Sequence, residues 1–311
     1  MQNLQNVGRF SLRAASRHLR QMNTQAPPKY GQYHIPTSDQ LVNFQIGQPS
    51  PSMLPLDIIR ECAANKLAET DPLLLQYGYI PGYPAFRKSL AKFLTTRYFD
   101  GIPSEVTDEE VFATTGVTGG LSLICNLFFE AGDDLFAEDP TYFLAMRIFE
   151  DFKLNVTQIP MEQDGLDLDA LEIRLKGGHV PKALYTIPTA HNPTGRTLSS
   201  EKRERLCELS QQYGFKVIAD EVYHMLTFPD VTPPLPMCTF DKGGTVMSLG
   251  SFSKILAPAL RMGWVQCKNP DLLDVMAGCG QLDSSGGMNP VMSSIVHEAS
   301  ATTCKHMCQW W

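Results

Sequence analysis

The residues with the clearest chemical potential surround one lysine, Lys254. Ser251 and Ser253 precede it, and Arg261 follows it by seven positions. A lysine amine can form a Schiff base with an aldehyde, and hydroxyl groups beside a guanidinium can hold a phosphate. This segment therefore predicts a site for an aldehyde cofactor that carries a phosphate. The alternative is an ordinary surface lysine in a serine-rich turn.

A carboxylate that could serve such a cofactor is Asp220. It ends the apolar run Lys216–Ala219, which is typical of a parallel strand, and ligands of open α/β sheets bind at the carboxyl ends of strands. A carboxylate there could keep a ring nitrogen protonated, so that the ring withdraws electrons. The alternative is an aspartate that caps the following helix.

A glycine-rich turn, residues 114–120, offers a second contact for the phosphate. It follows the strand-like run Glu110–Ala113 and precedes the apolar helical stretch Leu121–Phe129. A strand, a turn and a helix in this order direct backbone N–H groups and a helix N-terminus at an anion. Many α/β proteins contain such a turn, so it is weak evidence by itself.

Three motifs in this chain resemble those of the class I/II aminotransferases, a group of pyridoxal 5'-phosphate (PLP) enzymes of fold type I. They occur in the family's order and spacing, and the resemblance covers about residues 43–290. It implies PLP as the cofactor, attached to Lys254 and paired through its ring nitrogen with Asp220. The motifs are Asn192–Gly195, Asp220 with Tyr223, and Ser251–Lys254.

The resemblance also implies roles around the cofactor ring. Asn192 and Tyr223 would bind the ring oxygen, Asn192 would also face the substrate, and Tyr142 would stack on the ring. Lys254, Asp220 and Tyr223 form the expected catalytic set. Ordinary alternatives are a turn at Asn192, since Asn-Pro and Gly mark turns, and a core position for Tyr142.

For the phosphate, the resemblance implies contacts from Val117, through its backbone, and from Thr118, Ser251, Ser253 and Arg261. Many family members have Ser and Gln or Ala in place of Val117 and Thr118, so this site is a variant. Arg261 lies one position closer to the lysine than in many members. That spacing resembles the 2-aminoadipate, kynurenine and aromatic branch, which includes the PLP domain of MocR-type regulators.

Two further positions match family residues that lie outside these motifs and contact a neighbouring subunit or the substrate. Tyr77 matches a tyrosine that reaches the phosphate of a neighbouring subunit, which implies a homodimer with a shared active site. The motif containing it ends at Arg87 and is typical of the family. Gly47 matches a loop that lines the substrate side.

The implied activity is transfer of an amino group between an amino acid and a 2-oxo acid by a ping-pong mechanism. Other PLP chemistry on the same fold, such as a C–S lyase or a decarboxylase, stays open because fold does not settle function. A non-catalytic, PLP-binding truncated isoform is the third alternative.

The rest of the chain must position these residues, and its pattern alternates between helix and strand. This alternation predicts an α/β fold with a mostly parallel sheet covered by helices, and the resemblance implies seven strands in the large domain. A long helix is expected over Asp271–Gly280. The expected helices are 54–69, 83–98, 141–152 and 199–213, and the expected strands are 111–114, 134–137, 153–159, 183–187, 216–219 and 245–249.

The expected domains are a basic extension (1–38), the first segment of a small domain (39–70), the large PLP-binding domain (71–290) and an atypical tail (291–311). Most of the small C-terminal domain is expected to be missing. The extension has five basic residues and no acidic one. That composition is typical of a mitochondrial transit peptide, with a disordered basic arm as the alternative and a cytoplasmic location also open.

Composition excludes several classes of protein. The 311 residues are 43% hydrophobic and 19% charged, which is typical of a soluble globular protein. A net charge of −7 argues against a nucleic-acid surface, and no apolar run is long enough for a membrane helix. Eight scattered cysteines favour a reducing compartment. Cys304, His306 and Cys308 faintly resemble a metal clip, but no metal site is predicted.

Overall fold

A computed structural model describes residues 47–99, 101–228 and 230–303 of the chain. The chain divides into two units, Met1–Gln48 and Pro49–Trp311. All the helices and strands in the described ranges belong to the second unit. The basic stretch 1–38 and the residues Cys304, His306 and Cys308 lie outside the described residues, so the predictions made for them are untested.

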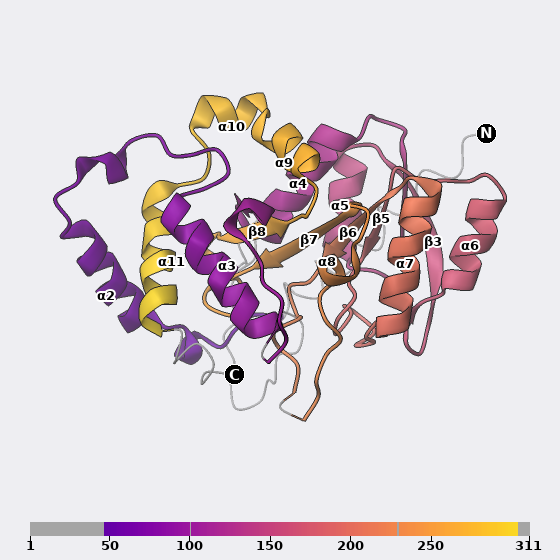
Figure 1. Cartoon of the computed structure of the whole chain (residues 1–311), viewed down its shortest axis with the longest axis horizontal. Coiled ribbons are helices and arrows are strands. Elements are labelled where there is room, and N and C mark those ends of the chain that lie inside the picture. The colour runs from indigo at the N-terminus through magenta and orange to yellow at the C-terminus, as the bar shows by residue number, and fades with distance from the viewer. Residues whose placement is uncertain (1–46, 100, 229, 304–311) are drawn as a thin grey trace, which may run out of the picture. The chain divides into compact units, whose positions relative to one another are not determined.

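An eight-stranded sheet forms the centre of this unit, in the order β1-β8-β7-β6-β5-β2-β3-β4 (Figure 1). Six strands run in one direction, whereas β8 and β4 run against their neighbours. The strands are β1 (Val111–Thr114), β2 (Asp134–Asp139), β3 (Asn155–Glu162), β4 (Gly165–Leu166), β5 (Ala183–Thr186), β6 (Lys216–Asp220), β7 (Val246–Ser251) and β8 (Gly263–Gln266).

The predicted α/β fold with a mostly parallel sheet is therefore confirmed, with eight strands instead of seven. The additional strand is the two-residue β4, which forms a hairpin with the end of β3. The four-residue β8 was absent from the expected strands. β8 is short and follows the loop that contains Lys254, so its hydrophobic pattern alone did not distinguish it from that loop.

Helices cover both faces of the sheet. The helices of the described residues are α2 (Leu56–Leu67), α3 (Pro84–Tyr98), α4 (Gly116–Phe128), α5 (Phe143–Asp151), α6 (Leu168–Lys176), α7 (Ser200–Tyr213), α8 (Met237–Phe240), α9 (Pro270–Ala277), α10 (Gly280–Ser285) and α11 (Pro290–Thr303). Short 3-10 helices are η1 (Pro51–Met53), η2 (Pro72–Leu75), η3 (Asp108–Glu110) and η4 (Pro258–Leu260).

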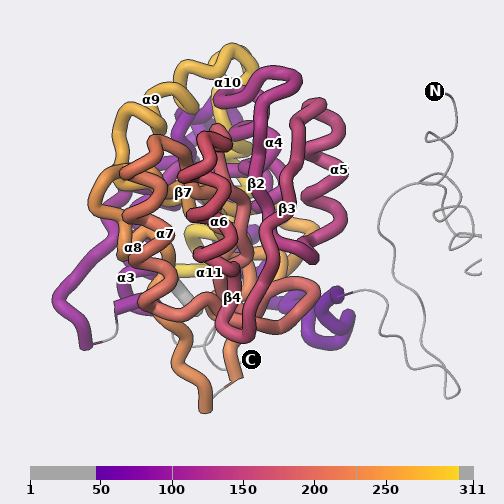
Figure 2. Tube along the Cα trace, turned by 90° about the vertical axis from the view of Figure 1, so that its right-hand side faces the viewer, coloured from indigo at the N-terminus to yellow at the C-terminus, as the bar shows by residue number. Residues whose placement is uncertain are grey.

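Alternation of side chains along the strands divides the core between these faces. On β6, Ile218 packs in a cluster with α4, α5 and α9, whereas Val217 and Ala219 pack with α6, α7 and α8. Figure 2 shows α5 on one side of β2 and β3 and α7 on the other. Successive strand residues point to opposite faces, so a strand covered on both faces is apolar throughout.

A third cluster joins α3 to β1 and β8 around Phe252 and Trp264. Helix α11 packs against both α2 and α3 (Figure 1). Arg87 ties α3 to the sheet because its Nε donates to the carbonyl oxygen of Val111 at 2.8 Å. The domain boundaries expected from the sequence stay predictions.

Two expected elements differ in the structure. The single long helix over Asp271–Gly280 is wrong, because α9 ends at Ala277 and the separate α10 begins at Gly280. Glycines at 278 and 280 favour this break, since glycine is a poor helix former. Helix α4 begins at Gly116, inside the stretch that was expected to be a turn.

Within the described part of the chain, no helix is long and apolar enough to cross a lipid bilayer. The six cysteines of that part are all buried and unpaired with one another. Burial raises the pKa of Cys125 and of Cys207 to about 12, so both thiols stay protonated at neutral pH.

Candidate functional site

Asp220 lies buried at the carboxyl end of β6, with 4% of its surface exposed. The hydroxyl of Tyr185 donates to its Oδ2 at 2.9 Å, and the backbone N–H of Val222 donates to its Oδ1 at 3.3 Å. Loss of water on burial raises the pKa of Asp220 to about 6 in spite of these two bonds. A buried carboxylate of this kind is suited to a cationic partner, such as the protonated nitrogen of a pyridine ring.

Three polar side chains gather near this carboxylate. The side-chain amide of Asn192 donates to the hydroxyl of Tyr223 at 3.5 Å. Burial raises the pKa of both Tyr223 and Tyr142, and the charge of Asp220 contributes to both shifts. The fold therefore brings together Asn192, Tyr142 and the pair Asp220 and Tyr223 from three separate segments, as their expected roles around one ring require.

Asn192 is presented by a tight turn between β5 and α7. The peptide bond between Asn192 and Pro193 is cis, and Ala190 has φ +47°. The backbone N–H of Gly195 donates to the carbonyl oxygen of His191 at 2.6 Å and closes the turn. The turn predicted from the sequence is thus present, and it holds the asparagine side chain beside Tyr223.

A cradle for an anion lies at the first turn of α4. The N–H groups of a first helical turn have no acceptor within their helix, and they carry the positive end of the helix dipole. Gly116 opens this helix with φ +79°. A Cβ atom on Gly116 would lie 3.1 Å from Nη2 of Arg261 and 3.5 Å from Oγ of Ser251. Glycine thus leaves room where the helix, a guanidinium and a hydroxyl meet.

The donors of this cradle are held in place by neighbouring backbone. Nη2 of Arg261 donates to the carbonyl oxygen of Thr115 at 3.0 Å, and Arg261 itself has φ +51°. The backbone N–H of Ser253 donates to Oγ of Ser251 at 3.0 Å. Val117 and Thr118 lie in the same first turn of α4. These groups fit a phosphate, which accepts hydrogen bonds from all of them.

Lys254 lies in the turn that follows β7. Strands β6 and β7 are parallel neighbours, so Asp220 and the segment that carries Lys254 leave the sheet at the same edge. Burial lowers the pKa of the Lys254 amine. A lower pKa increases the neutral share of the amine, which is the form that reacts with an aldehyde and accepts a proton.

Replacing Gly116 with alanine is expected to lower the affinity for PLP at least about tenfold, because the new methyl group enters the cradle. Alanine at a positive φ also costs about 1–2 kcal/mol. The matched control is Gly132→Ala, which has φ +94° and nothing within 4 Å of the added Cβ. Titration with PLP and thermal melting should show a similar loss of stability in both variants and a loss of affinity only at Gly116. Equal affinities would contradict the cradle.

Tyr77 and Gly47 are the two predicted residues whose expected roles involve a neighbouring subunit or the substrate. Tyr77 follows η2 and is 76% exposed, so it is free to contact another molecule. Gly47 belongs to the first unit of the chain. Their expected roles, toward a neighbouring subunit and toward the substrate, stay predictions.

Sequence reasoning missed a buried carboxylate network behind the asparagine turn. Glu138 is the second-last residue of β2, near the same edge, where its Oε1 accepts from Oγ1 of Thr186 at 2.6 Å and its Oε2 from the N–H of Ile187 at 2.9 Å. Nε2 of His191 lies 2.9 Å from Glu138 Oε2, and Thr194 Oγ1 lies 2.9 Å from Nδ1 of the same ring. The network anchors the turn that presents the asparagine. The one signal for it was a glutamate directly after an apolar run.

Sequence reasoning assigned no role to Arg203 either, because a charged residue in a helix is usually exposed to solvent. It is fully buried, and its Nη2 donates to the carbonyl oxygen of Pro188 at 2.7 Å and to Oγ1 of Thr189 at 2.8 Å. Its Nη1 donates to the carbonyl oxygen of Leu235 at 3.0 Å and lies 3.7 Å from Oε1 of Glu221. Arg203 therefore joins the loop after β5 to the loop after β6.

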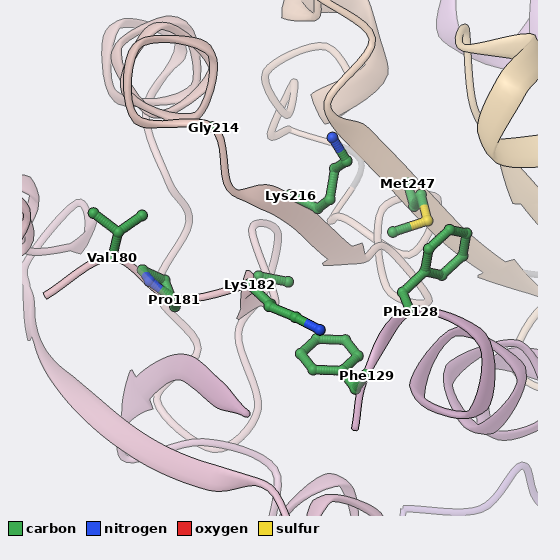
Figure 3. Close-up of a pocket in the computed structure, with 9 residues that line it drawn as sticks. Phe128, Phe129, Val180, Pro181, Lys182, Gly214, Lys216 and Met247 are labelled. Carbon is green, nitrogen blue, oxygen red and sulfur yellow. The ribbon is translucent and has the colours of Figure 1, made fainter. Parts of the chain in front are cut away.

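A separate cavity of about 290 Å³ lies at the opposite edge of the sheet, where β5 and β6 begin (Figure 3). Its lining includes Phe128, Phe129, Lys182 and Lys216. Nζ of Lys182 is paired with Oδ2 of Asp133 at 2.7 Å. None of the residues that line this cavity belongs to the cluster around Asp220.

The fold and this cluster define a class of protein that holds a phosphate-bearing ring at the carboxyl edge of an α/β sheet. Residues 39–303 match the family described as aminotransferase class I and II, and the chain belongs to that family. The match extends past Pro290, where the resemblance was expected to end, and includes α11.

Relatives and solved structures agree with this assignment. The chain is 36% identical to aromatic-amino-acid aminotransferase 1 of Thermococcus litoralis and 33% identical to 2-aminoadipate transaminase of Thermus thermophilus. These alignments cover 74% and 72% of this chain but 55% and 54% of the relatives. The chain thus spans about half the length of the curated relatives it matches.

Among solved structures, the α-aminoadipate aminotransferase of Thermus thermophilus, bound to N-(5'-phosphopyridoxyl)-L-leucine, superposes with a TM-score of 0.75 at 29% identity. That match covers 86% of this chain and 66% of the other. The kynurenine aminotransferase of Pyrococcus horikoshii gives a TM-score of 0.73 at 29% identity, over 85% of this chain and 65% of the other. The fold is therefore that of the fold type I aminotransferases.

Proposed function

We propose that this chain is the PLP-binding part of an aminotransferase that moves an amino group between an amino acid and a 2-oxo acid. The observation that carries the proposal is the pairing of two complementary sites on one sheet edge. Asp220 is a buried carboxylate suited to a cationic ring nitrogen, and the cradle of Gly116, Ser251 and Arg261 is suited to a phosphate. Lys254 lies three residues after Ser251, the last residue of β7.

PLP, when bound, supplies an electron-withdrawing ring that stabilises negative charge on the α-carbon of the substrate. The protein supplies the remaining functions. Asp220 keeps the ring nitrogen protonated, and Asn192 with Tyr223 binds the ring oxygen. The amine of Lys254 attaches the cofactor and later takes a proton from the α-carbon of the substrate as general base. The lowered pKa of Lys254 favours this role.

We also propose a ping-pong order of substrates and a homodimer with a shared active site. Support for the dimer comes from the segment that contains Tyr77, where large apolar side chains are concentrated on the surface. Exposed apolar side chains concentrated in one segment are consistent with a protein–protein interface. The exposed members of this segment are Met53, Leu54, Leu56, Leu67, Leu73, Leu75, Tyr77 and Tyr79.

The substrates are proposed only at the level of their class. Aromatic amino acids, 2-aminoadipate and kynurenine appear in the names of the relatives and solved structures, and they are the first amino acids to test. Targeting to mitochondria by the basic stretch 1–38 is likewise a proposal, with a cytoplasmic location as the alternative.

The deciding experiment is the visible absorption spectrum of the purified chain with PLP, recorded before and after the addition of aromatic amino acids, 2-aminoadipate or kynurenine. We expect a bound-cofactor band that shifts to the pyridoxamine phosphate spectrum while a 2-oxo acid is released. Release of carbon dioxide or of a thiol would instead indicate a decarboxylase or a C–S lyase. A band that forms but never shifts would reduce the function of this chain to cofactor binding.

A further inference from the structure

The aspartate proposed to pair with the cofactor has a buried neighbour of its own. Tyr185 lies on β5, the strand next to β6, and none of its surface is exposed. Its hydroxyl donates to Oδ2 of Asp220 at 2.9 Å. The ring of Phe149 packs against the Tyr185 ring edge to face, with centroids 5.4 Å apart. The tyrosine hydroxyl is therefore held in one place by the core.

We propose that Tyr185 is a positioning residue that orients the Asp220 carboxylate and keeps it ionised for the ring nitrogen of the cofactor. This inference rests on the proposed function. The geometry supports it because the two residues sit on adjacent parallel strands, where both side chains are fixed by backbone and by packing. A side chain fixed in this way holds a functional group more accurately than a loop does.

The pKa values of Tyr185 and Asp220 keep the tyrosine hydroxyl in its protonated form, so that it always donates to the carboxylate. Burial raises the pKa of Tyr185 well above its ordinary value, and the neighbouring Asp220 raises it further. The phenol thus stays protonated throughout the pH range of enzyme function. Its hydrogen bond lowers the pKa of Asp220, against the larger effect of burial, which raises that pKa. An ionised carboxylate cannot donate, so the bond strengthens when Asp220 is charged.

The other hydrogen bond of the carboxylate is weaker. The N–H of Val222 lies 3.3 Å from Oδ1 of Asp220, which is long for a bond to a charged group. Each carboxylate oxygen can accept more than one donor. Oδ1 therefore keeps capacity for the ring N–H of the cofactor while Oδ2 is held by Tyr185.

The test compares PLP affinity of the cofactor-free chain between pH 5.5 and 8.5 for the wild type, Tyr185→Phe, Asp220→Asn and the double variant. Loss of a hydrogen bond to a charged group should raise the pKa of Asp220 by about one unit. We therefore expect the pH midpoint of the Asp220-dependent binding to rise by about one unit in Tyr185→Phe. Affinity should fall about eightfold at pH 5.5 and about threefold at pH 6.5, and it should recover at pH 8.5.

Two controls separate this role from simple packing. Tyr98→Phe removes the hydroxyl of another buried tyrosine, which packs on His224 with ring centroids 5.1 Å apart, and it should leave the midpoint unchanged. In the chain that already carries Asp220→Asn, adding Tyr185→Phe should not change how PLP affinity depends on pH, because the carboxylate whose pKa Tyr185 lowers is absent. A unit shift in the single variant that disappears in this background supports the proposal.

Other outcomes overturn it. A profile identical to the wild type, or an equal loss of affinity at every pH, would show that the hydroxyl does not tune Asp220. If Tyr185→Phe loses the far-ultraviolet circular dichroism of the wild type, replacing Tyr185 alone by 3-fluorotyrosine keeps the shape and strengthens the donor. The midpoint should then fall, and an unchanged midpoint would overturn the proposal. Failure of the wild type to bind PLP would overturn the proposed function together with this inference.

Discussion

Replacing Lys254 with alanine is expected to abolish the covalent attachment of the cofactor and to lower amino transfer by about 10²–10⁴-fold or more. The variant loses the only amine that the proposal assigns to the α-carbon proton of the substrate. PLP itself should still bind, because the cradle at Gly116 and the carboxylate of Asp220 remain. The measurement is borohydride reduction of the chain with PLP, followed by mass spectrometry of its peptides.

Lys268→Ala is the matched control for this experiment. Lys268 is an exposed lysine that follows β8 and lies outside the proposed machinery, so its variant should keep both the reduced adduct and the activity. If the adduct persists at full yield on another lysine in Lys254→Ala, the assignment of Lys254 is wrong. If small external amines partly restore amino transfer to Lys254→Ala, its role in moving the proton is supported.

Asp220→Asn is expected to change activity and stability in opposite directions. Replacing the carboxylate with an amide removes the negative charge that keeps the ring nitrogen of the cofactor protonated. Amino transfer should therefore fall about 10²–10³-fold, which is the usual effect of removing one preorganised electrostatic contact from an active site. The same change removes a buried charge from the cofactor-free chain. That chain should therefore melt at a higher temperature than the wild type near neutral pH.

The sign and size of the stability effect follow from the pKa of Asp220. It is about 6 in the folded chain against an ordinary value of 3.8. The folded state therefore binds its proton more tightly than the unfolded state does. The resulting penalty is complete above about pH 6, shrinks as the pH falls toward 4, and reaches about 3 kcal/mol at most. The gain in stability of Asp220→Asn over the wild type should therefore be largest above about pH 6 and should shrink as the pH falls toward 4.

Thermal melting of the cofactor-free chain at several pH values, paired with assays of the loaded chain, checks both halves of this prediction. The contrasting control is Asp241→Asn. Asp241 is also buried, but it accepts from the N–H groups of Gly243, Thr245 and Val246 at the start of β7. Its variant should lose stability and keep its activity per folded molecule. A lower melting temperature in Asp220→Asn at pH 7.5 would contradict the uncompensated burial of this carboxylate.

The motif residues could be predicted from the sequence because each motif is contiguous and adjoins a strand or a turn. Lys254, Asp220 and Asn192 follow apolar runs that form β7, β6 and β5, and parallel strands release their ends at one edge. The structure brings these segments to that edge and places Tyr142 and Tyr223 with them. Their roles in chemistry stay predictions for the experiments above.

Other features were invisible because they depend on partners that are distant in the sequence. Tyr185 looks like any apolar strand residue until β5 lies beside β6, and Arg203 looks like a surface charge until two loops close over α7. The cradle at Gly116 includes Arg261 and Ser251, which lie far from it in the sequence. No local pattern contains these contacts.

The sequence by itself thus determined the α/β class, the family and the residues with chemical potential, since periodicity and short motifs are local properties of the chain. Only the tertiary structure decided the order of the eight strands, the burial of Asp220 and the identity of the residue that holds it. The physical reason is that desolvation and hydrogen bonding between strands arise only after packing. The raised pKa of Asp220 results from that packing, so it cannot be predicted from the residues next to Asp220 in the sequence.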